Sequence, residues 1–138
     1  AWQMQYFGCT NCPQAAPDAD PLGKGISNTN QFLSGFNPTS AAAYPHIIKI
    51  VKSGSDMNVT YLGANGDLSW SPGIGSRTNV LEFTTGSPTG NYSNNFVSVV
   101  GGTNILSGGT GLGTNVTAVD TGGATGTNRY YRIRVIAP

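Results

Sequence analysis

The feature that most restricts the fold is a series of short apolar runs, broken by Gly, Asn, Ser or Pro, that begins at Tyr44. Several runs alternate apolar and polar residues, which is the period of a β-strand with one buried face. About eight such runs predict an antiparallel β-sandwich over residues 43–138. We expect strands at 46–53, 57–63, 67–71, 79–85, 95–100, 103–107, 115–120 and 129–136. In the last run, Tyr131, Ile133 and Val135 should point one way and Tyr130, Arg132 and Arg134 the other.

Residues 1–42 follow a different pattern. The stretch "AWQMQYFG" predicts a short amphipathic helix that ends at Gly8. A turn-rich segment follows, and Ser27 can then cap a second helix through "NTNQFLSG", which Gly35 ends. We therefore expect a mainly β protein in which a small helix–loop–helix segment (1–42) precedes an antiparallel β-sandwich (43–138).

The chain is poor in charge, with 9% Asp, Glu, Lys and Arg against roughly 25% in an ordinary soluble domain. A net charge of +1 gives no field that would attract nucleic acid. Membrane spans need about 20 consecutive apolar residues, and the sequence has no such run. The composition is typical of a secreted β-protein, located outside the cell or on its surface. We expect a processed mature chain or a segment of a larger one.

Cys9 and Cys12, in "FGCTNCPQ", are the two cysteines. A zinc site would need two more Cys or His ligands, and His46 is the single histidine. A redox motif would place a helix at the first Cys, where the nearby prolines disfavour one. The pair therefore predicts a local disulfide and an oxidising compartment.

Residues 20–31 have the frame of an EF-hand calcium loop, in which positions 1, 3, 5, 9 and 12 supply oxygens and position 6 is Gly. With Asp20 at position 1, Gly25 takes position 6. Asn28 and Gln31 then fall at positions 9 and 12. Positions 3 and 5, however, are Leu22 and Lys24.

The segment "WQMQYFGCTNCPQAAPDADPLGKGISNTNQFLSGFNPTS" resembles an acidic segment of many large secreted bacterial surface proteins. Its usual form is a W…YFG helix, a D-P-D-G-D-G-x-S-N-x-x-E loop and an E-F-x-x-G-T-D-P-T turn. It is similar to dockerin and thrombospondin type 3 calcium loops, and it often precedes a fibronectin-III-like sandwich that ends in a "RYYRIRV"-like strand. The resemblance implies a secreted, modular and often non-catalytic protein whose β-sandwich (43–138) is Ig- or fibronectin-III-like.

The chain departs from that family where calcium would bind, because Leu22, Lys24 and Gln31 replace three anionic ligands. Such a loss should weaken a calcium site by orders of magnitude. One hypothesis is that the Lys24 ammonium takes the place of the metal, held by Asp18, Asp20 or nearby carbonyls. The alternative is that Lys24 points to solvent. We expect no cofactor; weak calcium binding at Asp18 and Asp20 stays open.

No catalytic motif is present in the sequence. His46 has no partner nearby in sequence, so a half-exposed position at a strand end is expected. Glu82 is expected on the solvent face of a strand, opposite Arg132 or Arg134. No motif selects a catalytic pair among the carboxylates Asp56, Asp67, Glu82 and Asp120. We predict a protein that is not an enzyme.

Four aromatic residues are candidates for a sugar-binding platform: Tyr61, Trp70, Tyr92 and Tyr130. The other interpretation, which we favour, is that Trp70 fills the core and the tyrosines cover its edges. Sequons at Asn58, Asn91 and Asn115 and the many Ser and Thr residues leave glycosylation open.

The N-terminal segment carries Trp2, Met4, Tyr6 and Phe7, a large apolar load for a short helix. Either its own chain or a neighbouring copy must bury that face. Contact with a neighbour would be head-to-tail and would build a filament when it does not close into a ring. We therefore predict an extracellular structural protein, a filament or surface-matrix subunit whose partners are copies of itself. The alternative is a carbohydrate-binding or adhesion module of a larger protein.

Overall fold

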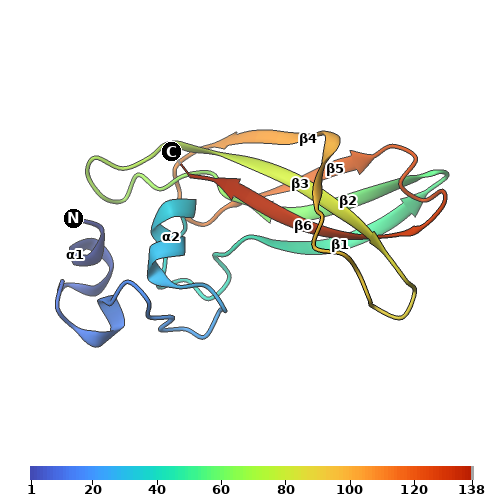
Figure 1. Cartoon of the computed structure of the whole chain (residues 1–138). Coiled ribbons are helices and arrows are strands. Elements are labelled where there is room, and N and C mark those ends of the chain that lie inside the picture. The colour runs from blue at the N-terminus through green and yellow to red at the C-terminus, as the bar shows by residue number, and fades with distance from the viewer. Residues whose placement is uncertain (138) are drawn as a thin grey trace.

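The computed structural model describes residues 1–137 and places short helices at one end of two antiparallel β-sheets (Figure 1). In the helical part, α1 spans Trp2–Phe7, the 3-10 turn η1 spans Pro13–Ala15 and α2 spans Asn28–Ser34. The strands are β1 (His46–Ser53), β2 (Asp56–Gly63), β3 (Ser76–Gly86), β4 (Val97–Ser107), β5 (Thr114–Asp120) and β6 (Asn128–Ile136).

Both predicted helices are confirmed, and so are the residues that end them. Gly8 and Gly35 follow α1 and α2 in the left-handed conformation, with φ of 67° and 73°, which glycine adopts without a Cβ penalty. The Ser27 hydroxyl accepts a hydrogen bond from the backbone N–H of Asn30 and caps α2.

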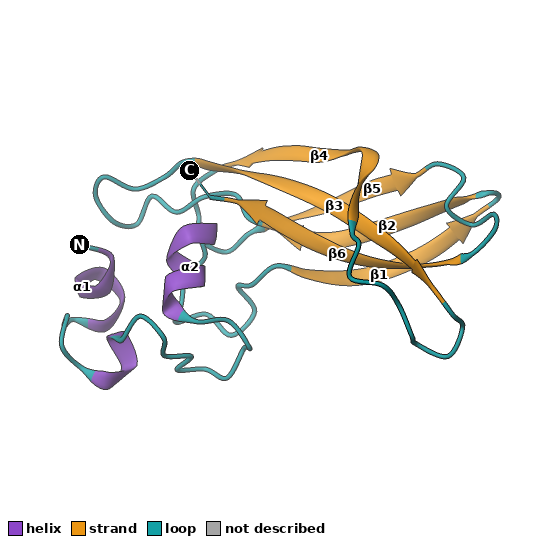
Figure 2. Ribbon diagram, viewed as in Figure 1, coloured by secondary structure: helices purple, strands orange, loops and turns teal. Residues whose placement is uncertain are grey.

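The strands form two sheets, with the orders β1-β2-β5 and β4-β3-β6 (Figure 2). All the pairings are antiparallel. Strands β4 and β5, one from each sheet, lie next to each other, and β1 and β6 do the same. The predicted mainly β class is confirmed.

The prediction of eight strands is wrong, because the described residues form six. Residues 67–71 lie in a loop that makes isolated bridges at Asp67, and the left-handed glycines Gly66 and Gly73 turn the chain on either side. The runs 95–100 and 103–107 belong to one strand, β4. Between them Gly101 and its neighbours form a bulge rather than a turn, since Thr103 pairs with Val80 and Ser98 with Glu82.

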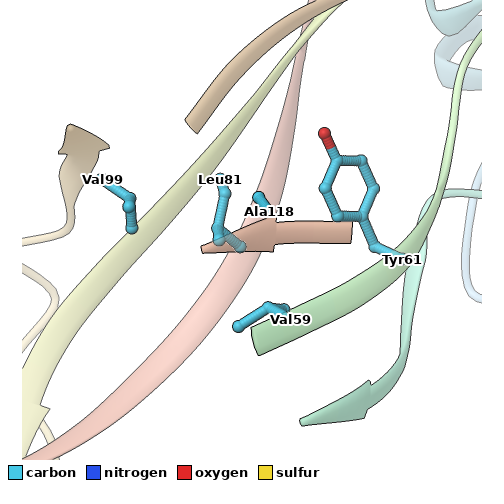
Figure 3. Packing of buried hydrophobic residues seen from close by; sticks show 5 residues of the cluster. All are labelled: Val59, Tyr61, Leu81, Val99 and Ala118. Atoms are coloured by element: carbon cyan, nitrogen blue, oxygen red, sulfur yellow. The ribbon is translucent and has the colours of Figure 1, made fainter. Parts of the chain in front are cut away.

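The two sheets share one cluster of buried apolar side chains (Figure 3). Val59, Tyr61 and Ala118 come from the β1-β2-β5 sheet, and Leu81 and Val99 from the other. A second cluster joins the helical end to the sheets; it comprises Phe36, Ala43 and Ala64, with Leu62 and Val135 packed against it. The predicted inward side of β6 is confirmed, since Tyr131, Ile133 and Val135 pack on these clusters.

One buried amide ties the end of β2 to β3. The Asn79 side chain is fully buried; its Oδ1 accepts the Ala64 N–H at 2.8 Å and its Nδ2 donates to the Ala64 carbonyl at 2.8 Å. The side chain thus satisfies both backbone groups of a residue that leaves the sheet ladder.

Candidate functional site

At the helical end of the molecule, α1 docks on other residues of its own chain. Trp2 is 6% exposed and makes edge contacts with the rings of Tyr6, Phe7 and Phe32. The Tyr6 hydroxyl donates to Oδ2 of Asp67 at 2.6 Å. Burial, followed by this hydrogen bond, raises the pKa of Tyr6 to about 12. α1 is therefore held by both apolar and polar contacts.

The apolar face of the N-terminal segment is covered by its own chain, which is one of the two alternatives that the sequence left open. Trp2 and Tyr6 are occupied within the chain, because α2 and the loop after β2 supply their partners. They are therefore not available as the contact between copies that we expected from the sequence. Phe7 is half-buried, and Met4 remains 53% exposed.

Two buried charged residues lie at the helical end: Asp67, which binds α1 through Tyr6, and Arg77, which binds α2. The Asp67 carboxylate is buried and also accepts the backbone N–H of Ser69 at 3.0 Å. Arg77 is buried too, and its Nε donates to the Leu33 carbonyl at 2.9 Å, in the last turn of α2. A cation is favourable there because the C-terminal carbonyls of a helix carry partial negative charge. Burial lowers the pKa of Arg77, against the opposing charge of Asp67.

The side chain of Lys24 turns inward and is enclosed by carbonyl groups. Its Nζ donates to the backbone carbonyls of Asn37, Ser40 and Ala43 at 3.3, 2.9 and 3.1 Å. Of the two positions left open by the sequence, the structure shows an ammonium held by nearby carbonyls, and the solvent-directed position is wrong. The ammonium thereby ties loop 20–25 to the 37–43 turn.

Asp20 caps the loop instead of binding the ammonium. Its Oδ1 accepts the Lys24 N–H at 2.9 Å and its Oδ2 the Gly25 N–H at 2.6 Å. The Lys24 N–H is the first cause that holds the pKa of Asp20 below its usual range. Asp18 is exposed and, among residues 1–137, has no hydrogen bond to its carboxylate.

The other two residues expected to supply oxygens to the metal loop, Asn28 and Gln31, lie on α2. Asn28 and Gln31 are buried on α2, and Asn28 Nδ2 donates to the Gln14 and Ala16 carbonyls, both at 2.8 Å. Asn28 Oδ1 and both polar atoms of the Gln31 side chain have no hydrogen-bond partner within 1–137. Asp20 and Asn28 thus bind different parts of the backbone, at residues 24–25 and at residues 14–16. The described part of the chain also holds no group of three His, Cys, Asp or Glu residues that could bind a metal.

The predicted disulfide between Cys9 and Cys12 is present, with the Cα atoms 5.9 Å apart. It closes the segment between α1 and η1. The side chains of Gln3, Asn28 and Thr29 then fix the backbone that follows, because they donate to carbonyls of residues 14–17.

The four aromatic residues proposed for sugar binding do not form one platform. Tyr61 is 0% exposed, so its assignment as a glycan contact is wrong, and it belongs to the shared core instead. Trp70 lies at the helical end, where it packs on Phe32 and lines a pocket of about 490 Å³ with Trp2. Phe32 was missed in the sequence, although its i, i+4 spacing from Asn28 puts both on one face of α2.

Tyr92 and Tyr130, in contrast, are brought together on the outer side of β6. Their rings stack with centroids 5.0 Å apart, and Tyr92 is 53% exposed. Phe96 meets Tyr92 edge-on, and the Arg132 guanidinium lies 4.1 Å from the Phe96 ring centre. Figure 1 shows why these residues meet: the connection from β3 to β4 crosses in front of β6. No periodicity in the sequence predicts that crossing.

A groove of about 580 Å³ runs beside this aromatic cluster, and β1, β6 and the β3–β4 connection line it. A neighbouring hollow of about 340 Å³ shares Arg129, Tyr130 and Tyr131 with it and extends to Lys52. We call the two together the β1/β6 groove. Its walls combine aromatic rings with basic side chains.

The predicted Glu82–arginine pairing is confirmed. Glu82 Oε1 and Oε2 accept from Nε of Arg132 at 2.9 Å and of Arg134 at 3.0 Å. Burial raises the pKa of Glu82, but the two arginines outweigh it and leave the pKa below its usual value. Glu82 is only 5% exposed, because the side chains of Arg132 and Arg134 cover it on this outer face of β3.

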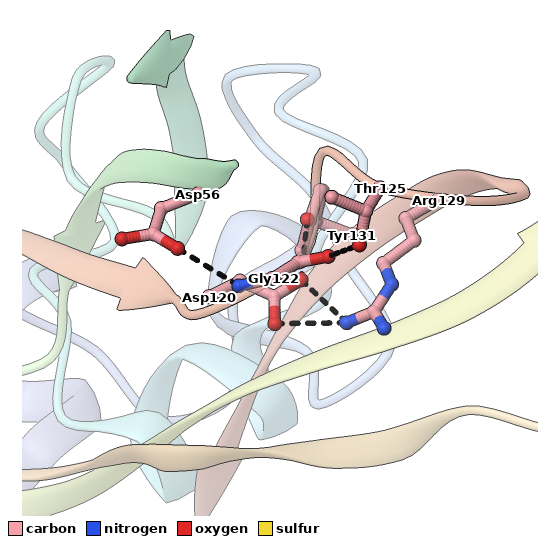
Figure 4. Close-up of polar contacts among 6 residues, drawn as sticks. All are labelled: Asp56, Asp120, Gly122, Thr125, Arg129 and Tyr131. Atoms are coloured by element: carbon pink, nitrogen blue, oxygen red, sulfur yellow. Dashed lines mark hydrogen bonds and ion pairs between the residues drawn. The ribbon is translucent and has the colours of Figure 1, made fainter. Parts of the chain in front are cut away.

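The other carboxylates also have structural partners. Asp120 accepts two hydrogen bonds from Arg129, at 2.8 and 2.7 Å, and one from the Tyr131 hydroxyl at 2.6 Å (Figure 4). Burial, then Asp120, raises the pKa of Tyr131. Asp56 accepts the Gly122 N–H at 2.8 Å and fixes the turn after β5. His46 is half-buried at the start of β1, as expected, and stacks on Tyr44.

Comparison with known proteins found no matching family model, no matching curated protein and no matching solved structure. No helix within residues 1–137 has the length and apolar character needed to span a bilayer.

Proposed function

We propose that this chain is a non-enzymatic extracellular structural subunit that associates with copies of itself. We further propose that its two sheets form a fibronectin-III-like β-sandwich, completed at one end by a degenerate calcium-loop segment. The shared core of Val59, Tyr61, Leu81, Val99 and Ala118 supports the sandwich. The Cys9–Cys12 disulfide supports an oxidising, extracellular location.

The observation that carries self-association is an unequal distribution of charge over the two long edges of the sheets. Residues 83–119, which include all of β4 and all but the last residue of β5, contain no Asp, Glu, Lys or Arg. Strands β1 and β6 form the opposite edge and carry five of the seven basic residues: Lys49, Lys52, Arg129, Arg132 and Arg134. Proteins commonly protect edge strands from pairing with other chains by placing charges on them. The β4/β5 edge lacks that protection.

The most exposed apolar side chains of the six strands lie on the same edge. Val100 is 96% exposed and Ile105 is 73% exposed on β4, and Val97 is also exposed. Burying such side chains against another copy removes them from water, which is favourable by about 25 cal/mol per Å². Like-with-like pairing of the β1/β6 edge would instead bring basic residues together. Two copies therefore associate through their β4/β5 edges.

A filament needs a second contact surface, since one two-fold contact closes into a dimer. The helical end offers Met4 and Leu68, which are 53% and 59% exposed and lie beside Trp70. We place the second contact there. Of the N-terminal residues that the sequence predicted to contact a neighbouring copy, this second contact uses Met4.

Light scattering on the native chain, with and without a calcium chelator, tests this function. We expect large particles that the chelator does not change. Ile105→Lys and Met4→Lys should each reduce the particles to small oligomers, because each variant disrupts one of the two proposed contacts and leaves only the other. Leu22→Lys adds the same charge at another exposed apolar position and should have no effect.

A 14.3 kDa particle for the unchanged chain would overturn the proposal. If the unchanged chain forms only a dimer, and Ile105→Lys dissociates it, the β4/β5 contact would stand and the filament proposal would be overturned. Particles that dissociate on chelation would show that loop 20–31 holds calcium.

A further inference from the structure

We propose that the β1/β6 groove binds acidic polysaccharide, with sugar rings on the Tyr92–Tyr130 stack and carboxylates on the neighbouring basic side chains. The inference goes beyond self-association, and it concerns the opposite edge from β4 and β5. Either proposal can therefore fail while the other stands.

The aromatic part of the groove is preformed. The Tyr130 hydroxyl donates to the Ser87 carbonyl, which fixes that ring, and Tyr92 stacks on it with an angle of 29° between the planes. The half-exposed Tyr92 therefore presents a ring whose position is already set. The C–H groups on one face of a sugar ring carry partial positive charge and pack on the negative face of an aromatic ring.

The charge of the groove selects an acidic ligand. Lys52, Arg129 and Arg132 line it, and Arg134 lies two residues further along β6. Asp120 and Glu82 are the carboxylates that pair with these arginines, so positive charge remains in excess. Lys52 forms no ion pair within the described chain.

The arginines also keep hydrogen-bond donors for a ligand. Arg132 and Arg134 each use Nε for Glu82, and Arg129 uses one terminal nitrogen for Asp120. Because a guanidinium has five N–H groups in a planar fork, the rest can meet a carboxylate. The Glu82 and Asp120 contacts hold the arginine side chains in place before the ligand arrives.

The test uses polygalacturonate and its fully methyl-esterified form as probes, since the two share a backbone and differ in charge. Binding is followed by affinity electrophoresis and by titration of the Tyr92 signals in NMR. We expect polygalacturonate to bind and the ester not to bind. Tyr92→Ala and Lys52→Gln, which change exposed side chains, should each weaken binding about threefold to tenfold. Trp70→Ala is the matched aromatic control at the helical end and should leave binding unchanged.

Three results would overturn the proposal. Equal binding of the methyl ester would show that charge does not matter. Loss of binding in Trp70→Ala but not in Tyr92→Ala would move the site to the helical end. Tighter binding of single-stranded oligothymidylate than of polygalacturonate would make the groove a nucleic-acid site.

Discussion

The ammonium of Lys24 lies 2.9 Å from the carbonyl oxygen of Ser40, sixteen residues further along the chain. With the Asn37 and Ala43 carbonyls, this contact gives the cation three oxygen partners. Hard cations are bound in proteins by such carbonyl oxygens. The chain thus supplies its own cation to a turn that would otherwise gather partial negative charge.

Replacement of this cation should be costly. Lys24→Met keeps the length of the side chain but leaves three carbonyls without a donor, and we expect the free energy of unfolding to fall by about 1–3 kcal/mol. Urea unfolding followed by Trp fluorescence measures the change. Lys52→Met, at an exposed lysine, is the control and should be nearly neutral. Equal stability of the two variants would contradict the structural role of Lys24.

Alkaline pH should release α1. The pKa of Tyr6 is about 12 in the folded chain against 10.0 as reference. The folded state keeps this proton to a higher pH than the unfolded state does. The contribution of Tyr6 to stability is therefore complete below pH 10 and is lost as pH rises toward 12. Tyr6→Phe should remove this part of the alkaline loss and, by breaking the bond to Asp67, lower stability near neutral pH by about 2 kcal/mol. Unfolding curves across that pH range test both effects; an unchanged alkaline limb in Tyr6→Phe would refute the assignment.

Glu82 should contribute in the opposite pH range. Its folded pKa lies below the reference value of 4.5, so its contribution is present above that pH and is lost as pH falls through the folded pKa. Glu82→Gln should therefore flatten the acid limb of the stability profile. Asp18→Asn changes an exposed carboxylate and serves as the control. The idea fails if both variants lose stability with acid as steeply as the unchanged chain.

Asn79 should be among the most sensitive polar positions. Asn79→Ala leaves the N–H and carbonyl of Ala64 without partners in a buried place, and we expect a loss of about 3 kcal/mol. Hydrogen exchange of the Ala64 amide would report the loss locally. Asn94→Ala, at an exposed asparagine, should change neither measurement.

Local rules predicted the helix ends and the last strand. Gly8, Ser27 and Gly35 act within one turn of the chain, and the alternation in β6 needs no knowledge of distant residues. The Glu82–Arg132 pair was also predictable, because strand alternation places both side chains on one face.

Long-range features were not predictable in this way. The partners of Lys24 are backbone carbonyls, which every residue has, so no sequence pattern marks them. The bulge beside Gly101 interrupts the pairing of β4 with β3, and the meeting of Tyr92 with Tyr130 depends on how the β3–β4 connection crosses β6. Tyr61 was assigned to a possible glycan surface because a sequence does not show which face of β2 is covered.

The uncharged stretch 83–119 has a consequence for the media in which this chain can work. A contact made by apolar side chains and backbone groups has no Coulomb attraction for dissolved ions to screen. Contacts between copies through β4 and β5 would therefore persist from fresh water to brine, whereas a polyanion held at β1 and β6 would be released as ionic strength rises. One edge of the chain would then form a salt-resistant contact with other copies, and the other edge would release its ligand at high ionic strength.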